Sequence, residues 1–350
     1  MASIAILSNP ESDGNKSRLE RLRDYCAGRS DILHIEVERT EDVGIVLNRI
    51  AMAQPDVIVV NGGDGTVQYV LTELFGEGSP DRPLPPIAVL PSGKTNLIAK
   101  DLSSVGDPIR ALERVLTLAR EGVGDNIVSR QLISLDDGGG GRPVLGMFLA
   151  AGALADILLF CRHKLYPLGL PNGIAHTLTI IGGLISVITD WSSRYLPPKP
   201  RAIGLQVGEH HMRGRFQVLM VTTLRRLVLS GKVVAEREGT LQLLAIERRR
   251  RTVLRTVYET LLGRLGKRPI HGVHLRMGDH IRIEDEQSGV IMDGEYFIAA
   301  PGKTIILRPT QSVRFLDLGR AANATETFAA DIPLSAPGPQ RAAALLSDAR

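Results

Sequence analysis

Short apolar runs alternate with amphipathic segments along the first third of the chain. The runs at residues 3–7, 32–37, 56–60 and 87–90 are rich in Ile, Val and Leu and predict strands. The segments at residues 16–23, 41–53 and 67–75 have the spacing of helices with one apolar face. Strands that alternate with helices are typical of a βαβ-type layered sheet, so the sequence predicts an α/β N-terminal domain.

One more helix is expected before the pattern changes. Asp107 is a favourable N-cap residue, and Pro108 follows it at the first helical position. Apolar residues then recur at the helical spacing as far as Ala119. This helix closes the α/β unit, and we place the N-terminal domain at residues 1–128.

Beyond residue 128 the chain consists of strand-like runs separated by polar turns. The runs are 131–135, 144–148, 202–207, 215–221, 241–246, 280–283, 290–292 and 304–308. They predict a mostly β domain over residues 129–319, with a helical insertion at about 155–191. Residues 320–350 are rich in Ala, Ser and Pro without periodicity, which predicts a disordered tail.

Composition is that of an ordinary globular chain. The 350 residues are 43% hydrophobic, enough to bury a sizeable core, and the length favours two domains. Cys26 and Cys161 lie far apart and match no metal-ligand spacing, which argues against a zinc site or a disulfide framework and fits a reducing, cytoplasmic setting. The N-terminus resembles a first strand rather than a signal peptide. The apolar stretches 144–160 and 174–188 fall short of the roughly 20 residues of a spanning helix.

The charge pattern leaves two interpretations open. The net charge of +4 points weakly toward anionic partners, and four consecutive arginines stand at residues 248–251. These arginines are either a solvated surface or a contact with an anionic membrane surface. Nucleic acid is disfavoured, because aromatic residues make up only 4% of the chain and none interleave with the arginines.

The strand at 56–60 runs directly into a glycine-rich turn, NGGDGT at residues 61–66, and a helix follows. Glycines let backbone amides approach a ligand and the helix N-terminus favours an anion, so the turn predicts a phosphate site. Asp64 would repel phosphates unless a divalent cation, most simply Mg²⁺, lies between them. Thr66 is placed to cap the helix or to bind a phosphate oxygen. A turn without a ligand is the alternative.

The GGDGT motif at residues 62–66 resembles the nucleotide-binding signature of the diacylglycerol kinase catalytic domain family, which includes sphingosine and ceramide kinases and bacterial lipid kinases. A similar short motif occurs in NAD kinases and phosphofructokinases, so it does not identify the substrate. The resemblance implies an NAD kinase/diacylglycerol kinase-like fold with a Rossmann-like layered sheet. It also implies that Gly62, Gly63 and Gly65, with Asp64 and Thr66, bind ATP.

Two upstream segments extend this resemblance. The segment ILSNPESDGN, residues 6–15, is similar to the opening strand and Asn-Pro turn of the family, which implies that Asn9 and Pro10 contact the nucleotide. A plain surface turn is the alternative. Thr40 stands where the family keeps a nucleotide-contacting threonine, and an N-cap role is equally compatible with its position.

The segment LPSGKTNLIAKDL, residues 90–102, resembles a second phosphate-facing turn of the family, Pro-x-Gly-Thr-x-Asn-Asp. The resemblance implies that Gly93, Lys94 and Asn96 bind ATP. Lys94 replaces the usual Thr or Ser, and it either pairs with phosphate as a point charge or is solvated. Leu97 replaces the Asp of diacylglycerol kinases, a position at which sphingosine kinases also lack an acid.

Two further segments concern catalysis and the acceptor. GVIMDGEYFI, residues 289–298, is similar to a family strand with an Asp-Gly-Glu turn, which implies that Glu295 is the general base and, with Asp64, a catalytic residue. The alternative is a plain hairpin turn. Residues 150–178 resemble the stretch of sphingosine and ceramide kinases in which an aspartate recognises the lipid head, which makes Asp156 a substrate-binding residue. Its alternative role is a salt bridge to Arg162 or Lys164.

Together, these matches cover nearly the whole chain, from residue 4 to about 318. They imply an ATP-dependent lipid kinase that transfers the γ-phosphate to a hydroxyl of a diacylglycerol-type or ceramide/sphingoid-type lipid. Mg²⁺ is the expected cofactor, and a cytoplasmic location with peripheral membrane contact is expected. An NAD kinase-like enzyme and a catalytically silent nucleotide sensor of the same fold are the alternatives. For the lipid kinase we expect the site in the cleft between the domains.

Overall fold

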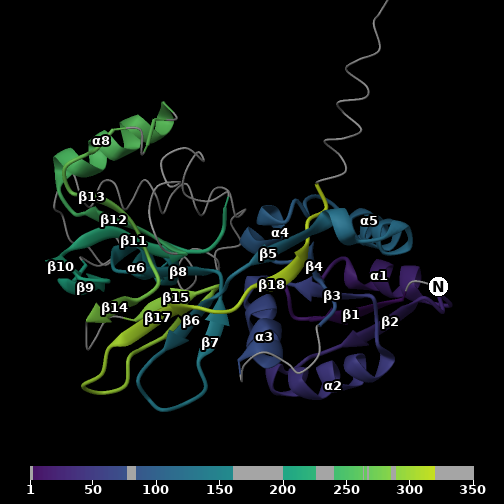
Figure 1. The fold of residues 1–350 in the computed structure, drawn as a ribbon. Coiled ribbons are helices and arrows are strands. Elements are labelled where there is room, and N and C mark those ends of the chain that lie inside the picture. The colour runs from purple at the N-terminus through teal and green to yellow at the C-terminus, as the bar shows by residue number, and fades with distance from the viewer. Residues whose placement is uncertain are drawn as a thin grey trace, which may run out of the picture.

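The computed structural model describes residues 3–76, 84–160, 200–225, 240–262, 264–265, 268–284 and 289–319. Over these ranges the chain forms three six-stranded sheets, one flanked by helices and two packed together (Figure 1). The predicted α/β N-terminal region followed by a mostly β region is therefore confirmed. Cys161, most of the predicted helical insertion and the predicted tail lie outside the described residues. Within those residues, no helix is long and apolar enough to cross a membrane.

The N-terminal sheet has the strand order β2-β1-β3-β4-β18-β5. Its first four strands in the chain run parallel; they are β1 (Ile4–Ser8), β2 (Ile32–Glu36), β3 (Val57–Gly62) and β4 (Ile87–Pro91). Every residue of β1, β3 and β4 is buried, as in parallel sheets covered on both faces. β18 (Val313–Leu316) lies between β4 and β5 (Ile127–Arg130), so the end of the described chain completes this sheet. The domain boundary predicted after residue 128 falls within β5 and stays a prediction.

Helices cover both faces of this sheet. They are α1 (Leu19–Cys26), α2 (Val43–Ala53), α3 (Asp64–Phe75), α4 (Leu97–Asp101) and α5 (Pro108–Glu121), with short 3₁₀ turns η1 (Thr40–Asp42) and η2 (Gly124–Asn126). α1 and α5 pack on one face, and α2, α3 and α4 pack on the other. α5 begins as the sequence predicts, since the Asp107 side chain accepts a hydrogen bond from the Ile109 amide at 2.8 Å.

The other two sheets are antiparallel and form a sandwich. One has the order β10-β9-β14-β17-β6-β7 and the other β13-β12-β11-β8-β15-β16. The first sheet contains β6 (Ile133–Asp136), β7 (Val144–Gly146), β9 (Ile203–Val207), β10 (His210–Gly214), β14 (Ile281–Glu284) and β17 (Ile305–Pro309). The second contains β8 (Phe148–Ala151), β11 (Phe216–Thr222), β12 (Leu241–Glu247), β13 (Val273–Gly278), β15 (Val290–Met292) and β16 (Glu295–Phe297). Their facing apolar side chains form one core.

Two helices each follow a strand of the second sheet. α6 (Ala153–Phe160) follows β8, and α8 (Arg250–Leu261) follows β12 (Figure 1). The predicted single run at 144–148 is in fact two strands, because the chain passes from one sheet to the other at Met147. This crossing places β8 beside β15, the first strand of the β15–β16 hairpin.

Two glycine turns meet at the carboxyl end of the parallel sheet. A Cβ atom built on Gly93 would lie 2.5 Å from the Gly63 Cα atom, so only glycine allows this approach. Beneath the turns, the buried Asn61 amide donates to the Ser8 hydroxyl at 2.9 Å and accepts from the Ser92 hydroxyl at 2.5 Å. These bonds hold the ends of β1, β3 and β4 in register.

We expect the Gly93→Ala substitution to destabilise the fold by about 1–3 kcal/mol, because the added methyl group forces two backbones apart. Urea unfolding measures this loss. Gly141→Ala is the matched control, since a Cβ there meets no atom within 4 Å. Equal stabilities of the two variants would show that the turns do not need their close approach.

Candidate active site

Four of the residues predicted from the sequence, Asp64, Gly65, Lys94 and Glu295, line a cavity of about 510 Å³. The N-terminal domain and the hairpin of β15 and β16 both contribute to its polar wall, which includes Asp64, Gly65, Lys94, Asp293 and Glu295. Its apolar wall contains Phe148, Leu158, Leu159 and Ile291. A cavity with one charged wall and one apolar wall suits a ligand that has both a charged and an apolar part.

Asp64 is the first residue of α3, and its carboxylate reaches across to the N-terminus of α4. One oxygen, Oδ2, accepts a hydrogen bond from the Leu97 amide and the other, Oδ1, from the Ile98 amide, both at 3.1 Å. Burial raises the pKa of Asp64, and these two amides act in the opposite direction. The carboxylate therefore joins the two phosphate-type turns and still borders the cavity.

The donor set at this position fits a hard cation. Each Asp64 oxygen uses one lone pair on an amide, which leaves a second one for a metal. Among the described residues, no three His, Cys, Asp or Glu side chains converge as a complete metal site. Asp64 would thus hold Mg²⁺ together with phosphate oxygens and water, which is the usual manner of binding this ion at nucleotides.

A set of long-range hydrogen bonds fixes the β15–β16 hairpin against α3 and β8. The Gln68 amide donates to the Met292 carbonyl at 3.0 Å. The buried Asp293 carboxylate accepts from the amides of Met147 at 2.7 Å and Phe148 at 3.0 Å. Asp293 has a φ of 47°, in the left-handed region, as the turn requires. These bonds fix the hairpin on both sides, and they thereby also fix the residue that follows its turn, Glu295.

Glu295 lies at the first turn of α3 as a consequence. A Cβ atom on Gly65 would lie 3.2 Å from the Glu295 Oε1 atom, so a glycine at this position makes room for the carboxylate. Burial raises the pKa of Tyr69, the Glu295 charge raises it further, and the Thr40 side chain lowers it through a hydrogen bond. Thr40 is therefore connected to this side of the site through Tyr69.

The loop after β1 packs over the first glycine turn. The Asn9 amide donates to the Thr66 hydroxyl at 3.0 Å, and the Ser12 hydroxyl accepts from the Gly63 amide at 3.2 Å. A Cβ atom on Gly62 would lie 2.6 Å from the Thr66 Cβ atom. Pro10 follows Asn9 in this loop. The predicted residues of the loop after β1 and those of the first glycine turn are thus brought together.

The second turn is shaped by Asn96. Its side chain accepts from the Gly93 amide at 2.7 Å and donates to the Gly93 carbonyl at 2.9 Å, while its φ of 54° is left-handed. Lys94 lies 3.3 Å from the Asp13 carboxylate and borders the cavity. The Lys94 ammonium is thus a cation at the cavity wall that already has one carboxylate partner.

Asp156 lies on α6, one turn from Leu159, but does not itself border the cavity. Burial raises its pKa, and the Arg201 charge lowers it. The other two cations considered for it, Arg162 and Lys164, lie outside the described residues. Asp156 therefore belongs to the helix that forms the apolar wall.

Several residues to which the motifs assign no role also lie in this region. Besides Gln68 and Tyr69, they include Asn15, whose side chain donates to the Asn9 and Asn61 carbonyls, and His34, which bonds the Ser8 hydroxyl at 2.8 Å. Their only signal is a polar residue at a position that the apolar pattern buries.

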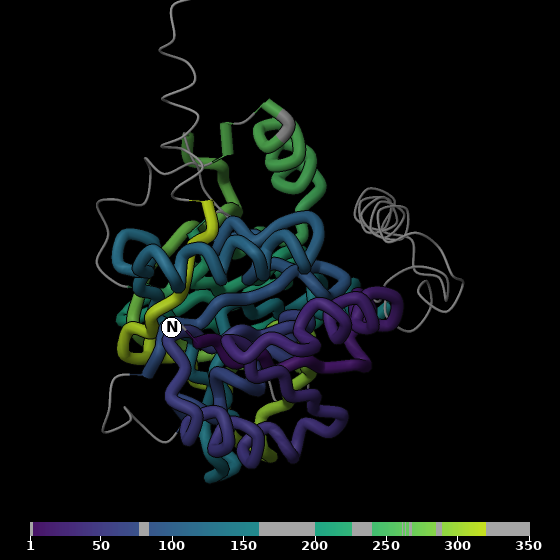
Figure 2. The backbone as a smooth tube through the Cα atoms, turned by 90° about the vertical axis from the view of Figure 1, so that its right-hand side faces the viewer, coloured from purple at the N-terminus to yellow at the C-terminus, as the bar shows by residue number. Residues whose placement is uncertain are grey.

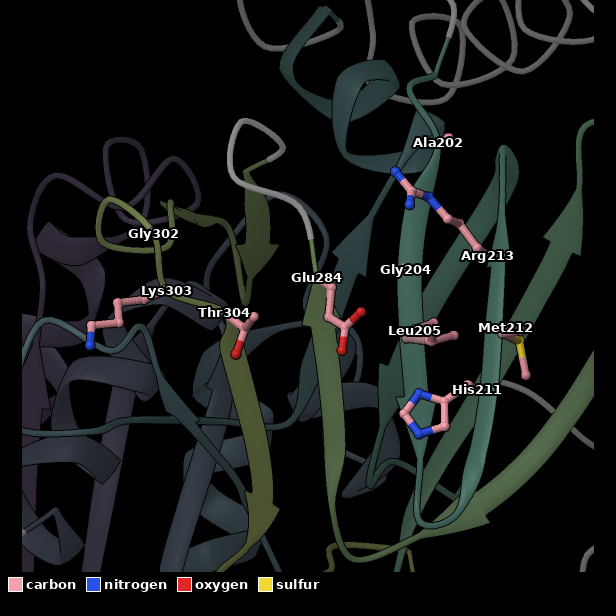
Figure 3. Close-up of a pocket in the computed structure, with 10 residues that line it drawn as sticks. All are labelled: Ala202, Gly204, Leu205, His211, Met212, Arg213, Glu284, Gly302, Lys303 and Thr304. Atoms are coloured by element: carbon pink, nitrogen blue, oxygen red, sulfur yellow. The ribbon is translucent and has the colours of Figure 1, made fainter.

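A second cavity, of about 800 Å³, lies elsewhere in the β sandwich. Figure 3 shows it along β9 and β10, with Arg213 and His211 on one side, Glu284 across Gly204, and Lys303 from the turn before β17. None of the predicted site residues borders it. Of the predicted residues, Asp64, Gly65, Lys94 and Glu295 border the cavity of about 510 Å³, and Gly93, Lys94 and Asn96 border a neighbouring one of about 380 Å³.

The buried Asp293 predicts a pH dependence of stability. Burial and the nearby Asp64 charge raise the pKa of Asp293 well above its usual value, while its two amide bonds act in the opposite direction. A carboxyl whose pKa is raised in the folded chain stabilises it below the unfolded pKa of about 3.9, and this contribution is lost as the pH rises through the folded pKa.

We therefore expect the unfolding free energy of the wild type, relative to Asp293→Asn, to fall as the pH is raised from about 4. Urea unfolding at a series of pH values measures the difference. Asp24→Asn, at an exposed position on α1, is the control. A difference between wild type and Asp293→Asn that stays constant with pH would contradict the assignment.

Comparison with known structures supports the fold. A crystal structure of a diacylglycerol kinase from Bacillus anthracis str. Sterne aligns with 90% of this chain and 96% of its own, at 14% identity and a TM-score of 0.54. Another protein of that organism, provisionally named a diacylglycerol kinase, aligns with 88% and 94% at 16% identity and a TM-score of 0.58. Yeast NADH kinase complexed with NADH aligns with 97% of this chain and 90% of its own, at 9% identity and a TM-score of 0.46.

Sequence comparison gives a match over one part of the chain. No match to a curated protein was found. Residues 3–123 match the model of the diacylglycerol kinase catalytic domain, a range that contains both glycine turns and the loop after β1. The resemblance to the diacylglycerol kinase catalytic domain family that the motifs indicate is thereby confirmed over residues 3–123.

Proposed function

We propose that the chain is an ATP-dependent lipid kinase that transfers the γ-phosphate of ATP to a hydroxyl of a membrane lipid. The observation that carries this proposal is the position of Glu295 at the first turn of α3, beside Asp64 and within one cavity. A nucleotide-type turn and a carboxylate that could accept a proton thus face the same space. The match of residues 3–123 to a diacylglycerol kinase catalytic domain supports the same activity.

The N-terminal part would bind the nucleotide. The amides at the start of α3 and the helix field attract phosphate, and Lys94 adds a positive charge at the cavity wall. Bound Mg²⁺ would offset the negative charge of the phosphates, and Asp64 is the residue placed to hold it. The two touching turns would keep these groups in fixed positions, on which phosphoryl transfer largely depends.

The β hairpin would supply the base. The acceptor hydroxyl oxygen forms a bond to the γ-phosphorus, the bond from that phosphorus to the β–γ bridging oxygen breaks, and ADP leaves. Glu295 takes the hydroxyl proton and later releases it to water. Its half-buried position, fixed by the hairpin bonds of Asp293 and Gln68, is suited to hold a proton acceptor at one place.

The apolar wall would receive the lipid chain. Phe148 and Ile291 come from the sheet, and Leu158 and Leu159 come from α6. An acceptor of the diacylglycerol type or of the ceramide or sphingoid type fits a cavity with a charged end and an apolar wall. Asp156, on the same helix, is proposed to recognise the polar head of the acceptor.

The proposal is tested with Mg²⁺, γ-labelled ATP and a total lipid extract, in which any labelled lipid is identified by mass. We expect one class of lipid to be labelled by the wild type and Asp64→Ala to lose the label. Glu11→Gln is the matched control, because Glu11 borders the same cavity without an assigned role, and its labelling should stay within about twofold of the wild type.

Absence of a labelled lipid, with ATP still bound, would contradict the proposal and favour the nucleotide sensor. Label transferred to NAD, supplied in a parallel reaction in place of the lipid extract, would favour the NAD kinase-like alternative. Equal labelling by Asp64→Ala and the wild type would remove Asp64 from the reaction.

A further inference from the structure

Helix α8 buries two threonines and one valine and leaves its larger apolar residues exposed. Thr252 and Thr256 face the protein, where the Thr252 hydroxyl donates to the His271 carbonyl at 3.0 Å and the Thr256 hydroxyl donates to the Thr252 carbonyl at 2.8 Å. Val253 packs against Leu244 and Ile246 of β12. The small inward side chains hold the helix on the sheet and leave its larger apolar residues outside.

Four large apolar side chains face outward here, three on α8 and the fourth, Leu262, directly after its end. Their exposed fractions are 46% for Leu254, 38% for Val257, 61% for Tyr258 and 44% for Leu262. Spacings of three and four residues place them on one side of the helix. Nine large apolar side chains are strongly exposed in the described part of the chain, and these are four of them. Such a concentration marks an interaction surface.

Arginines surround this apolar face. Arg250, Arg251 and Arg255 on the helix and Arg264 after it are all exposed, whereas Glu259 is the helix's one acidic residue. An exposed apolar stripe among arginines is the pattern of helices that lie in the surface of an anionic bilayer. The charge therefore selects an anionic lipid surface as the partner.

The helix and the cavity lie on the same face of one sheet. Directly paired residues form a row across five strands, Ile291, Ala150, Met220, Leu244 and Leu275. Ile291 borders the cavity, and Leu244 packs beneath α8. Residues opposite one another in a sheet point to the same side. Three strand spacings separate the strands of Ile291 and Leu244, a distance of about 15 Å. A surface that touches α8 therefore also faces the apolar wall of the cavity.

We propose that α8 docks the protein on an anionic lipid bilayer through Leu254, Val257, Tyr258 and the flanking arginines, with the cavity turned toward the same bilayer. Figure 2 shows the helix, in green, at the periphery of the molecule. The orientation rests on the proposed lipid kinase activity. Docking itself does not, because it needs neither nucleotide nor an acceptor.

The test is sedimentation of the full chain with vesicles of phosphatidylcholine, with and without phosphatidylserine, in the absence of ATP. We expect binding to the mixed vesicles and a loss of at least about tenfold for the triple variant Leu254→Ser/Val257→Ser/Tyr258→Ser. Ile45→Ser/Met52→Ser is the matched control, since both residues are strongly exposed on α2 of the other domain, and it should bind as the wild type does.

A second pair of variants tests the charge. Arg250→Ser/Arg251→Ser should weaken binding to the mixed vesicles by about fivefold for each arginine. Added salt should lower the vesicle binding of the wild type toward the level of this variant. Arg49→Ser/Arg110→Ser, at exposed positions of α2 and α5, should change little. Unchanged binding of either α8 variant, or an equal loss in the α2 control, would overturn the proposal.

Phosphorylation of a short-chain acceptor dispersed without vesicles distinguishes docking from catalysis. The α8 triple variant should retain this activity within about twofold, since none of its three residues borders the cavity. Light scattering identifies the competing occupant. A wild-type dimer that the triple variant converts to a monomer would assign the face to a second copy of the chain and overturn membrane docking.

Discussion

The contact between Gly63 and Gly93 is the constraint on which the site depends. A side chain at Gly93 would separate the two turns, and Asp64 would then lose the amides of Leu97 and Ile98. Because Asn61 bonds both Ser8 and Ser92 directly below, the approach is built into the ends of three parallel strands. A rigid meeting point of backbone amides is what a phosphate-binding site requires.

The β region adds the reactive group through a second constraint, the buried Asp293. Its charge is costly to bury next to Asp64, and two backbone amides offset part of that cost. With the Gln68 bond to Met292, it fixes a tight hairpin and thus the position of Glu295. The same sheet carries α6 and α8 on one face, so the proposed chemistry and the proposed contact with lipid would share one side of the molecule.

The sequence predicts the regular elements well where local physics decides. Asp107 and Pro108 start α5 as expected, and the apolar runs become buried strands. The sequence does not predict α8, because threonine and valine are weak helix formers and the apolar residues Leu254, Val257 and Tyr258 face outward. The sequence does not predict the crossing at Met147, because one apolar run supplies strands to two sheets and long-range strand pairing determines where it divides.

The residues of the candidate site likewise differ in how far the sequence predicts them. The first glycine turn has its own physical signature, since glycines, an acid and a helix start follow a buried strand. Glu295 carries no such signal, because a hairpin turn would use the same Asp-Gly pair, and only the family resemblance singles it out. Gln68 and Tyr69 carry none either, since Gln68 bonds Met292 and Tyr69 lies near Glu295, both of which are more than 200 positions away.

The most direct test of this account is a comparison of ATP binding and single-turnover phosphoryl transfer in Glu295→Gln and Glu11→Gln. Both variants remove one carboxylate charge from the same cavity. We expect Glu295→Gln to bind ATP as the wild type does but to transfer phosphate about 10²–10⁴-fold more slowly, whereas Glu11→Gln should do both normally. Transfer by Glu295→Gln at the wild-type rate would contradict the role of Glu295 as the base.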